Sequence, residues 1–202
     1  ILWHGAAELD RVVVCVGGAM GGLLGPDGGL FHQLGRRLAG DGIGLLRVGY
    51  RRPNVLTTCV HDTMAAMELA GRHGAERFVT VGHSFGGAVA IQAAARLDAA
   101  TVPGVVTLAT QSAGCEPAEQ LSDRSLLYFH GTADAILPHF ASEMVRMLAG
   151  AGELVLLEGA DHLLKPAGAE ILDRLATHLP EVLGIPDGGQ GDDGDSATSS
   201  TS

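Results

Sequence analysis

Ser84 stands at the centre of the pentapeptide Gly82–Gly86, in which a glycine lies two residues before and two residues after the serine. The β-rich run Arg77–Val81 precedes the pentapeptide, and a stretch of small residues, Gly87–Ile91, follows it. A strand, a sharp turn and a helix in this order form a nucleophile elbow, which holds a serine hydroxyl above the edge of a sheet. Only glycines let the strand and the helix approach closely at such a turn. The segment therefore predicts that Ser84 is a nucleophile.

A serine nucleophile needs a base that takes its proton and an acid that orients the base. Asp134 follows the predicted strand 125–129, and His162 follows the predicted strand 154–157. Because the carboxyl ends of parallel strands lie at one edge of a sheet, we expect both side chains to meet the serine there. Asp161 is the alternative acid, but adjacent side chains usually point apart, so we interpret it as a loop or capping group.

Three short segments in series resemble the α/β-hydrolase superfamily. They read Gly-His-Ser-Phe-Gly-Gly at 82–87, His-Gly-Thr-Ala-Asp at 130–134 and Gly-Ala-Asp-His at 159–162. The resemblance spans residues 11–180 and is to the small lidless esterases and dienelactone-hydrolase-like members, although dienelactone hydrolases proper use a cysteine nucleophile. It implies a serine hydrolase that cleaves carboxylic ester or thioester bonds of small acyl substrates. The implied triad is Ser84, Asp134 and His162, in the chain order of that fold.

The glycine-rich segment Gly17–Gly22 follows an early predicted strand. Its position matches the family's His-Gly-x loop, with glycine in the place where histidine is usual. By that match the backbone N–H groups of Ala19 and Phe85 form the oxyanion hole, Phe85 being the residue after the nucleophile. Gly18 and Met20 are the alternatives to Ala19 if the register of the loop differs.

Short apolar runs alternate with helical patterns along nearly the whole chain. The runs predict strands over residues 1–4, 11–16, 43–48, 77–81, 105–109, 125–129 and 154–157, and helices are expected near 30–38, 60–67, 87–97, after Pro138 and over 166–179. Because the runs are apolar throughout rather than alternating, the strands should be parallel and covered on both faces. The order predicts an α/β fold with a doubly wound, mostly parallel sheet and helices on both faces. The segment 110–124 is too short for a lid domain, so the site should be open.

The length of 202 residues suits one folded domain. We expect this domain over residues 1–185, followed by a disordered acidic tail of Gly, Asp, Ser and Thr over 186–202. The chain begins at Ile1 rather than at a methionine. Truncated amino-terminal strands and a removed secretion signal are therefore open alternatives.

The acidic balance of the chain limits its partners. Lysine and arginine number 13 against 23 aspartates and glutamates, which gives a formal net charge of −10. Because nucleic acids and anionic membranes bind basic surfaces, neither is expected as a partner. No stretch reaches the ~18 apolar residues of a membrane span, and no signal peptide is visible. We expect a small-molecule acyl substrate, and the oligomeric state stays open.

The spacing of the cysteines and histidines predicts neither disulfides nor a metal site. Cys15, Cys59 and Cys115 make no disulfide framework and no C-x-x-C spacing, which favours a reducing cytoplasm. The histidines outside the predicted triad show no metal-ligand spacing, so neither a metal nor another cofactor is expected. Among them, we expect His83 to pack behind the elbow and point away from the serine. His130 should pack or form a hydrogen bond at the end of its strand.

Two further segments lie near the predicted active edge. Arg51 and Arg52 follow the strand 43–48, and a solvated loop is the favoured interpretation. The alternative is that one arginine binds a substrate carboxylate. Gln111 and Ser112 are likewise assigned to a plain loop, with a place in the pocket wall as the alternative.

Two other functions fit the same residues. A cofactor-free perhydrolase uses the same triad, and the sequence does not separate it from an esterase. A non-catalytic ligand-binding protein on the same fold would be expected to lose a triad member or to obstruct the oxyanion loop. Because this chain keeps every part, hydrolysis is the favoured function.

Overall fold

Strands and helices alternate along residues 1–6 and 8–185, which are the residues that this computed structural model describes. The strands are β1 Leu2–His4, β2 Arg11–Val16, β3 Gly44–Val48, β4 Arg77–His83, β5 Gly104–Leu108, β6 Ser125–Gly131 and β7 Glu153–Leu157. The helices are α1 Leu30–Leu38, α2 Leu56–Arg72, α3 Phe85–Ala94, α4 Phe140–Ala149 and α5 Gly168–Leu183, with short 3-10 turns η1 Ala39–Asp41 and η2 Glu116–Gln120. All seven predicted strands are present. The predicted tail over 186–202 lies outside the described residues.

The strands form one sheet in the order β1-β3-β2-β4-β5-β6-β7. Every neighbouring pair is parallel except β1 and β3, which are antiparallel. From β2 the chain moves to one side for β3 and then returns to the other side for β4. The loops after β2 and β4 therefore leave the sheet next to each other, at the switch point where ligands bind in such folds. The predicted α/β fold with a mostly parallel sheet is confirmed.

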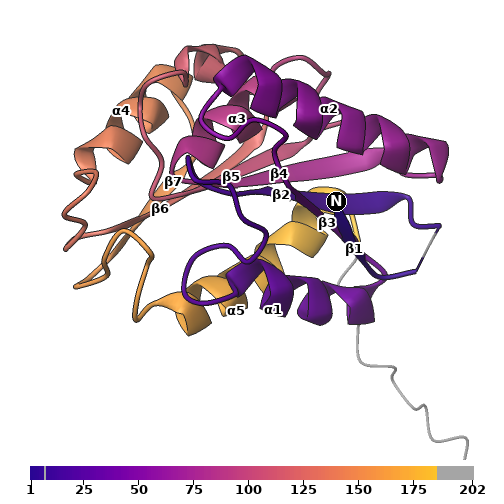
Figure 1. Cartoon of the computed structure of the whole chain (residues 1–202), viewed down its shortest axis with the longest axis horizontal. Helices are drawn as coiled ribbons and strands as arrows, with labels where there is room; N and C mark the ends of the chain where they lie inside the picture. The colour runs from indigo at the N-terminus through magenta and orange to yellow at the C-terminus, as the bar shows by residue number, and fades with distance from the viewer. Residues whose placement is uncertain (7, 186–202) are drawn as a thin grey trace, which may run out of the picture.

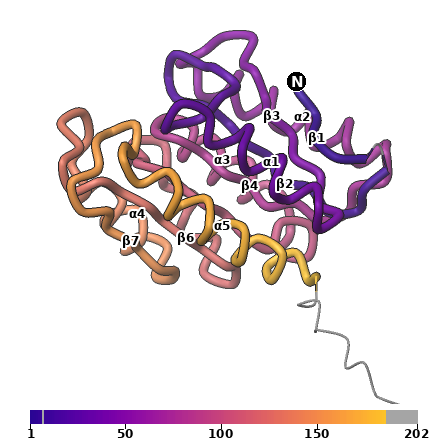
Figure 2. Tube along the Cα trace, turned by 90° about the horizontal axis from the view of Figure 1, so that it is seen from below, coloured from indigo at the N-terminus to yellow at the C-terminus, as the bar shows by residue number. Residues whose placement is uncertain are grey.

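Two layers of helices cover the sheet, as Figure 1 shows: α2, α3 and α4 lie on one face, and α1 and α5 on the other. Figure 2 shows α1 and α5 side by side across the second face. Strand β2 explains why the predicted runs are apolar throughout, since Val12 and Val14 pack in the first layer while Val13 and Cys15 pack in the second. Each fully buried valine contributes roughly 1.5–3 kcal/mol.

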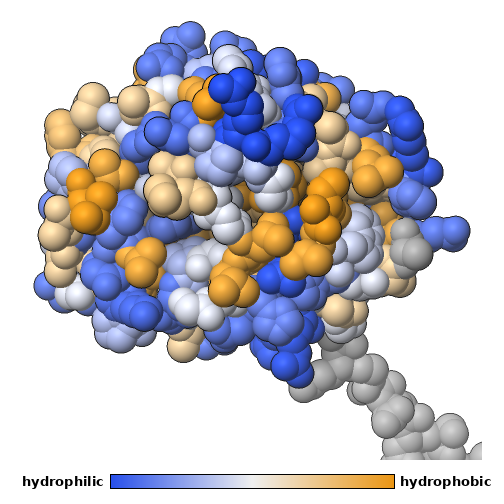
Figure 3. Space-filling model, viewed as in Figure 1, coloured by the Kyte–Doolittle hydropathy of each residue, from blue (hydrophilic) through white to orange (hydrophobic). Residues whose placement is uncertain are grey.

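Apolar side chains also reach the outer surface. Figure 3 shows them as orange and tan patches set among polar residues on the face seen in Figure 1. Within the described ranges, no helix is both long enough and apolar enough to cross a membrane.

Several element ends differ from the sequence prediction, most of all in α2, which runs from Leu56 to Arg72 rather than over 60–67. Strand β4 continues to His83 because Gly82 and His83 still pair with β5. Helix α3 begins at Phe85, directly after Ser84, rather than at residue 87. Helix α5 runs through Pro180 to Leu183 instead of ending at residue 179. Proline usually ends a helix, but the burial of Leu183 in the core favours the extra turn.

Candidate active site

Ser84 occupies the whole of the turn between β4 and α3. Its backbone has φ 55° and ψ −121°, a conformation that residues with a side chain rarely adopt. The turn is held because the Ser84 N–H donates a hydrogen bond of 2.8 Å to the Leu108 carbonyl, and the Ser84 carbonyl accepts one of 2.9 Å from the Gly87 N–H. Such strain persists only where the surrounding structure enforces it, and it is concentrated at functional sites.

The glycines on either side of Ser84 are required by backbone contact. A Cβ atom at Gly82 would lie under 3.0 Å from the Gly86 carbonyl oxygen, and one at Gly86 would lie under 3.0 Å from the carbonyl oxygens of Val16 and Gly17. These are main-chain atoms of α3, of the end of β2 and of the loop that follows it, and they cannot rotate away as a side chain could. The spacing of the two glycines thus reports how closely β4, α3 and that loop pack.

The structure brings the three sequence-predicted residues together at one sheet edge. His162 Nε2 lies 3.0 Å from Ser84 Oγ, and His162 Nδ1 lies 2.7 Å from Asp134 Oδ2. Asp134 comes from the loop after β6 and His162 from the loop after β7, as the order of the strands predicts. Because the carboxylate accepts from Nδ1–H, the neutral imidazole keeps its Nε2 lone pair for the serine hydroxyl.

The Asp134 carboxylate is fully buried and accepts four hydrogen bonds. Oδ1 accepts from the N–H groups of Ile136 and Leu137, each at 2.8 Å. Oδ2 accepts from His162 and, at 3.2 Å, from His130 Nε2. Burial alone would raise the pKa of Asp134, but the hydrogen bonds from Leu137, His162 and Ile136 outweigh it and lower the pKa below its ordinary value. The group stays ionised beside the imidazole.

Asp161, the alternative acid, has a different set of partners. Its Oδ1 accepts the Lys165 N–H at 3.0 Å, and its own N–H donates to the Lys165 carbonyl. The side chain therefore closes the turn 161–165 while Asp134 occupies the Nδ1 side of His162.

The glycine-rich loop after β2 lies beside Ser84, since a Cβ atom on Gly18 would be 3.6 Å from the Ser84 Cβ. Ala19 lines the same cleft as the serine. Phe85 is the first residue of α3, so its N–H has no partner within the helix. Both amides predicted for the oxyanion hole thus belong to segments that border Ser84.

Among comparisons with known proteins, only the comparison of structures finds proteins similar to this chain. No family model matches the chain, and no curated protein matches it in sequence. Est1E from Butyrivibrio proteoclasticus superposes with a TM-score of 0.72 at 13% identity, over 88% of this chain and 89% of that one. Dienelactone hydrolase from Anabaena variabilis gives 0.71 at 16% identity, over 88% of each chain. A monoacylglycerol lipase from Paleococcus ferrophilus gives 0.69 at 18% identity, over 90% of this chain and 98% of that one.

The chain has the α/β-hydrolase fold. At these identities the likeness shows the fold and not the reaction, because one fold carries many functions. Within this α/β-hydrolase fold the segment between β5 and β6 holds only η2, where a lid domain would be inserted.

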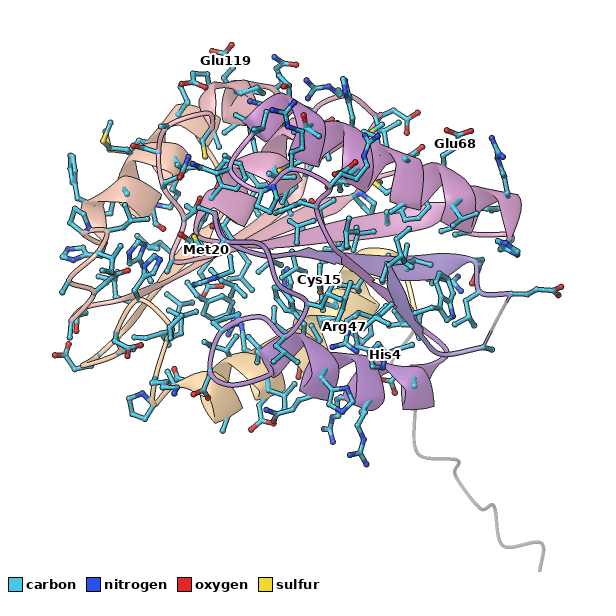
Figure 4. The ribbon with its side chains drawn as sticks, in the orientation of Figure 1. His4, Cys15, Met20, Arg47, Glu68 and Glu119 are labelled. Carbon is cyan, nitrogen blue, oxygen red and sulfur yellow. The ribbon has the colours of Figure 1, made fainter. Side chains whose placement is uncertain are left out.

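Two residues to which the sequence analysis gave no part in the site bond to the glycine-rich loop and to the residue that follows it. The Tyr50 hydroxyl donates to the Gly17 carbonyl at 2.9 Å, and its ring meets the Phe85 ring edge-on at 6.3 Å between centroids. The buried Arg47, labelled in Figure 4, donates to the Leu23 carbonyl at 3.2 Å. The signal in the sequence was the position of both residues at the carboxyl end of β3.

His83 lies at the site rather than only behind the elbow. Its ring borders the cleft, and Nε2–H donates to the His162 carbonyl oxygen at 3.0 Å. Burial lowers the pKa of His83 to about 4, so the ring is neutral near pH 7. His83 is buried and packed as expected, but its ring also reaches the loop after β7, because β4 extends to this residue. His130 bonds at its strand end as expected, to Asp134 and Ser142.

The cleft around Ser84 is open and has a volume of about 600 Å³. It is lined by Gly17, Gly18, Ala19, Met20, Gly21, Gly22, Leu23, Leu24, Gly25, His83, Ser84, Ile136, His162 and Leu163. Ser112 borders a separate groove beside α4, and the Gln111 side-chain amide donates to the Ala113 carbonyl. Within residues 1–6 and 8–185, no three His, Cys, Asp or Glu side chains gather in a way that could hold a metal ion.

The arginines at the end of β3 do not line the cleft. The Arg51 guanidinium pairs with Asp62 of α2, and the same carboxylate accepts the Arg51 N–H at 2.8 Å. Arg52 is exposed and likewise stands outside the set of lining residues. The alternative in which Arg51 clamps a substrate carboxylate would require it to leave Asp62.

Proposed function

We propose that this chain is a serine hydrolase that cleaves carboxylic ester or thioester bonds of small acyl substrates. Ser84 is the nucleophile, His162 the general base and Asp134 the acid that orients it. The observation that carries the proposal is the continuous hydrogen-bonded path from Ser84 Oγ through His162 to Asp134, with distances of 3.0 and 2.7 Å. Nucleophile, base and orienting acid within hydrogen-bond reach are the geometry of covalent acyl transfer.

The first half of the reaction forms an acyl-enzyme. As Ser84 Oγ attacks the substrate carbonyl carbon, its proton passes to His162 Nε2. The buried Asp134 carboxylate stabilises the imidazolium through Nδ1–H. Collapse of the tetrahedral intermediate breaks the bond to the leaving group, which takes the proton from Nε2 as an alcohol or thiol.

Water then repeats the sequence in the second half. His162 accepts a proton from water, and the resulting hydroxide equivalent attacks the acyl carbon. The acid product leaves as Nε2 returns the proton to Ser84 Oγ. In both halves the N–H groups of Ala19 and Phe85 stabilise the oxyanion, and removal of one such donor costs roughly 3 kcal/mol of barrier.

The structural neighbours support ester chemistry over other uses of the fold. One is named as a monoacylglycerol lipase and another as a dienelactone hydrolase. Est1E has been described with ferulic acid bound. These names concern those proteins, and they favour a hydrolase here because the triad geometry of this chain suits the same reaction class.

The test compares hydrolysis of p-nitrophenyl acetate and butyrate by the wild type, Ser84→Ala and Ser112→Ala. Ser84→Ala should lose at least 10³-fold in kcat, since the nucleophile is gone. Ser112→Ala is the matched control from the neighbouring groove and should keep wild-type turnover. A fluorophosphonate should label the wild type at Ser84 alone. Wild-type rates in Ser84→Ala would overturn the proposal, and ligand binding without turnover in the wild type would favour a non-catalytic role.

A further inference from the structure

The lining of the cleft around Ser84 carries no lysine, arginine, aspartate or glutamate among the residues that the structure describes. Its polar groups are the backbone of the glycine-rich loop and the side chains of Ser84, His83 and His162. Asp134 reaches the site only through His162, because its side chain is 0% exposed. A substrate group that rests on this lining therefore meets no ionic partner.

Large apolar side chains border the same cleft and are exposed to solvent. The exposed fractions are 93% for Met20, 59% for Leu24, 71% for Ile136 and 47% for Leu163. Exposed apolar side chains gathered around a cleft, rather than scattered singly, mark a surface that a ligand covers. In Figure 4, Met20 stands on the loop after β2, apart from the half-buried His4 and the buried Arg47.

The order of the strands places these side chains on both sides of the nucleophile. Ser84 follows β4; Met20 and Leu24 belong to the loop after β2, which is the neighbour of β4 on one side. Ile136 follows β6 and Leu163 follows β7, both on the other side of β4. An alkyl group that extends from an acyl carbon at Ser84 in either direction therefore meets apolar surface.

We propose that this cleft selects uncharged acyl groups with an alkyl chain of several carbons and rejects acyl groups that end in a carboxylate. The proposal rests on the function proposed above and names the substrate class of the same site. Covering the exposed apolar side chains favours the alkyl chain. A carboxylate in the same position would lose its water without a cation to replace it. The net charge of −10 adds a weaker repulsion of anionic substrates at low salt.

The experiment measures kcat/KM for p-nitrophenyl acetate, butyrate, hexanoate and the monoester of adipic acid. Adipate differs from hexanoate in having a carboxylate in place of the terminal methyl group. We expect kcat/KM to rise about three- to four-fold per methylene up to hexanoate, the gain for burying one CH₂. The adipate monoester should react about 100-fold more slowly than hexanoate.

Variants on each side of the cleft test whether its apolar side chains cause the preference for uncharged alkyl groups. Ile136→Ser and Leu24→Ser should each lower the hexanoate-to-acetate ratio of kcat/KM about five-fold, since each removes apolar contact area. Met147→Ser is the matched control, because Met147 is 70% exposed on α4 and borders a separate groove. Ile136→Lys should raise the adipate-to-hexanoate ratio at least 10-fold by supplying a cation, whereas Met147→Lys should leave it unchanged. A rise in kcat/KM for the adipate monoester itself cannot come from misfolding, which would lower the rates on both esters.

The outcomes separate this proposal from the one on which it rests. Absence of turnover on every ester would overturn the hydrolase itself. Turnover that is flat from acetate to hexanoate, or equal for adipate and hexanoate, would overturn the selectivity while leaving the hydrolase intact. Equal effects of the Ile136 and Met147 variants would overturn the assignment of the cleft.

Discussion

The imidazole of His83 donates its Nε2 proton to the backbone carbonyl oxygen of His162 over 3.0 Å. The two rings lie 5.2 Å apart between centroids. Because a carbonyl oxygen can only accept, this bond requires the Nε2–H tautomer of a neutral His83, or its cation. Burial holds the pKa near 4, which selects the neutral form at physiological pH. The last residue of β4 thus ties the loop that carries the proposed base to the strand that carries the nucleophile.

Loss of the hydrogen bond between His83 and the His162 carbonyl should lower kcat, with a smaller effect on substrate binding. In His83→Ala the His162 carbonyl loses its donor, so the loop shifts and the base is misplaced, which should lower kcat for p-nitrophenyl acetate roughly 10-fold with a smaller change in KM. His83→Gln keeps an N–H donor of similar reach and should recover most of the loss. Steady-state kinetics of both variants check this, and equal defects in the two would show that the ring acts only by packing.

The stability of the protein should fall as the pH drops from 6.5 to about 4. The pKa of His83 is lowered from 6.5 to about 4 in the folded state, so between these values the unfolded chain binds a proton that the folded chain does not. The loss amounts to roughly 3 kcal/mol at most. Burial also lowers the pKa of His130, which adds to the same trend. Because the pKa of Asp134 is lowered from 3.8, its contribution to the free energy of unfolding is lost only as the pH falls below that value.

Urea unfolding of the wild type and His83→Gln at several pH values isolates this residue. His83 is surrounded by His162, Asp134 and His130, all of which both proteins retain. The wild type should therefore exceed the variant in free energy of unfolding most at pH 7, and this difference should shrink as the pH is lowered to 4.5. A difference that stays constant across this range would mean that His83 does not titrate as its burial indicates.

The two candidate acids should differ sharply when their charge is removed. Asp134→Asn presents an amide to His162 Nδ1 and disturbs the tautomer that leaves Nε2 free, so kcat should fall roughly 10³- to 10⁴-fold. Asp161→Asn keeps an oxygen for the Lys165 N–H and should retain kcat within about three-fold. Thermal unfolding of both variants controls for folding. A larger loss in Asp161→Asn would reverse the assignment of the acid.

The glycine after the elbow should not tolerate even one methyl group. In Gly86→Ala the new Cβ meets the carbonyl oxygens of Val16 and Gly17, so the loop or the helix must move, with a loss of several kcal/mol and at least 100-fold in kcat. Gly71→Ala is the matched control, because nothing lies within 4 Å of its added Cβ in helix α2. That change should stabilise the protein by about 0.5–1 kcal/mol. Circular dichroism melts and initial rates check both.

Much of the framework could be predicted because its signals are local or follow from topology. An apolar run of five or six residues reports burial on both faces, and the glycines at 82 and 86 report a close turn. Parallel strands send their carboxyl ends to one edge, so the loops holding Asp134 and His162 could be placed near Ser84 before any coordinates. Element ends were less predictable, since pairing with β5 and the burial of Leu183 decide them.

By itself, the sequence determined the α/β fold, the succession of the strands along the chain and the three residues that meet at the sheet edge. Only the tertiary structure decided what surrounds them: the ring of His83 on the His162 carbonyl, Arg51 held by Asp62, and the apolar side chains on both sides of the cleft. The physical reason is that a residue's strand follows from local pattern, whereas the direction of a loop side chain depends on packing between segments far apart in the chain.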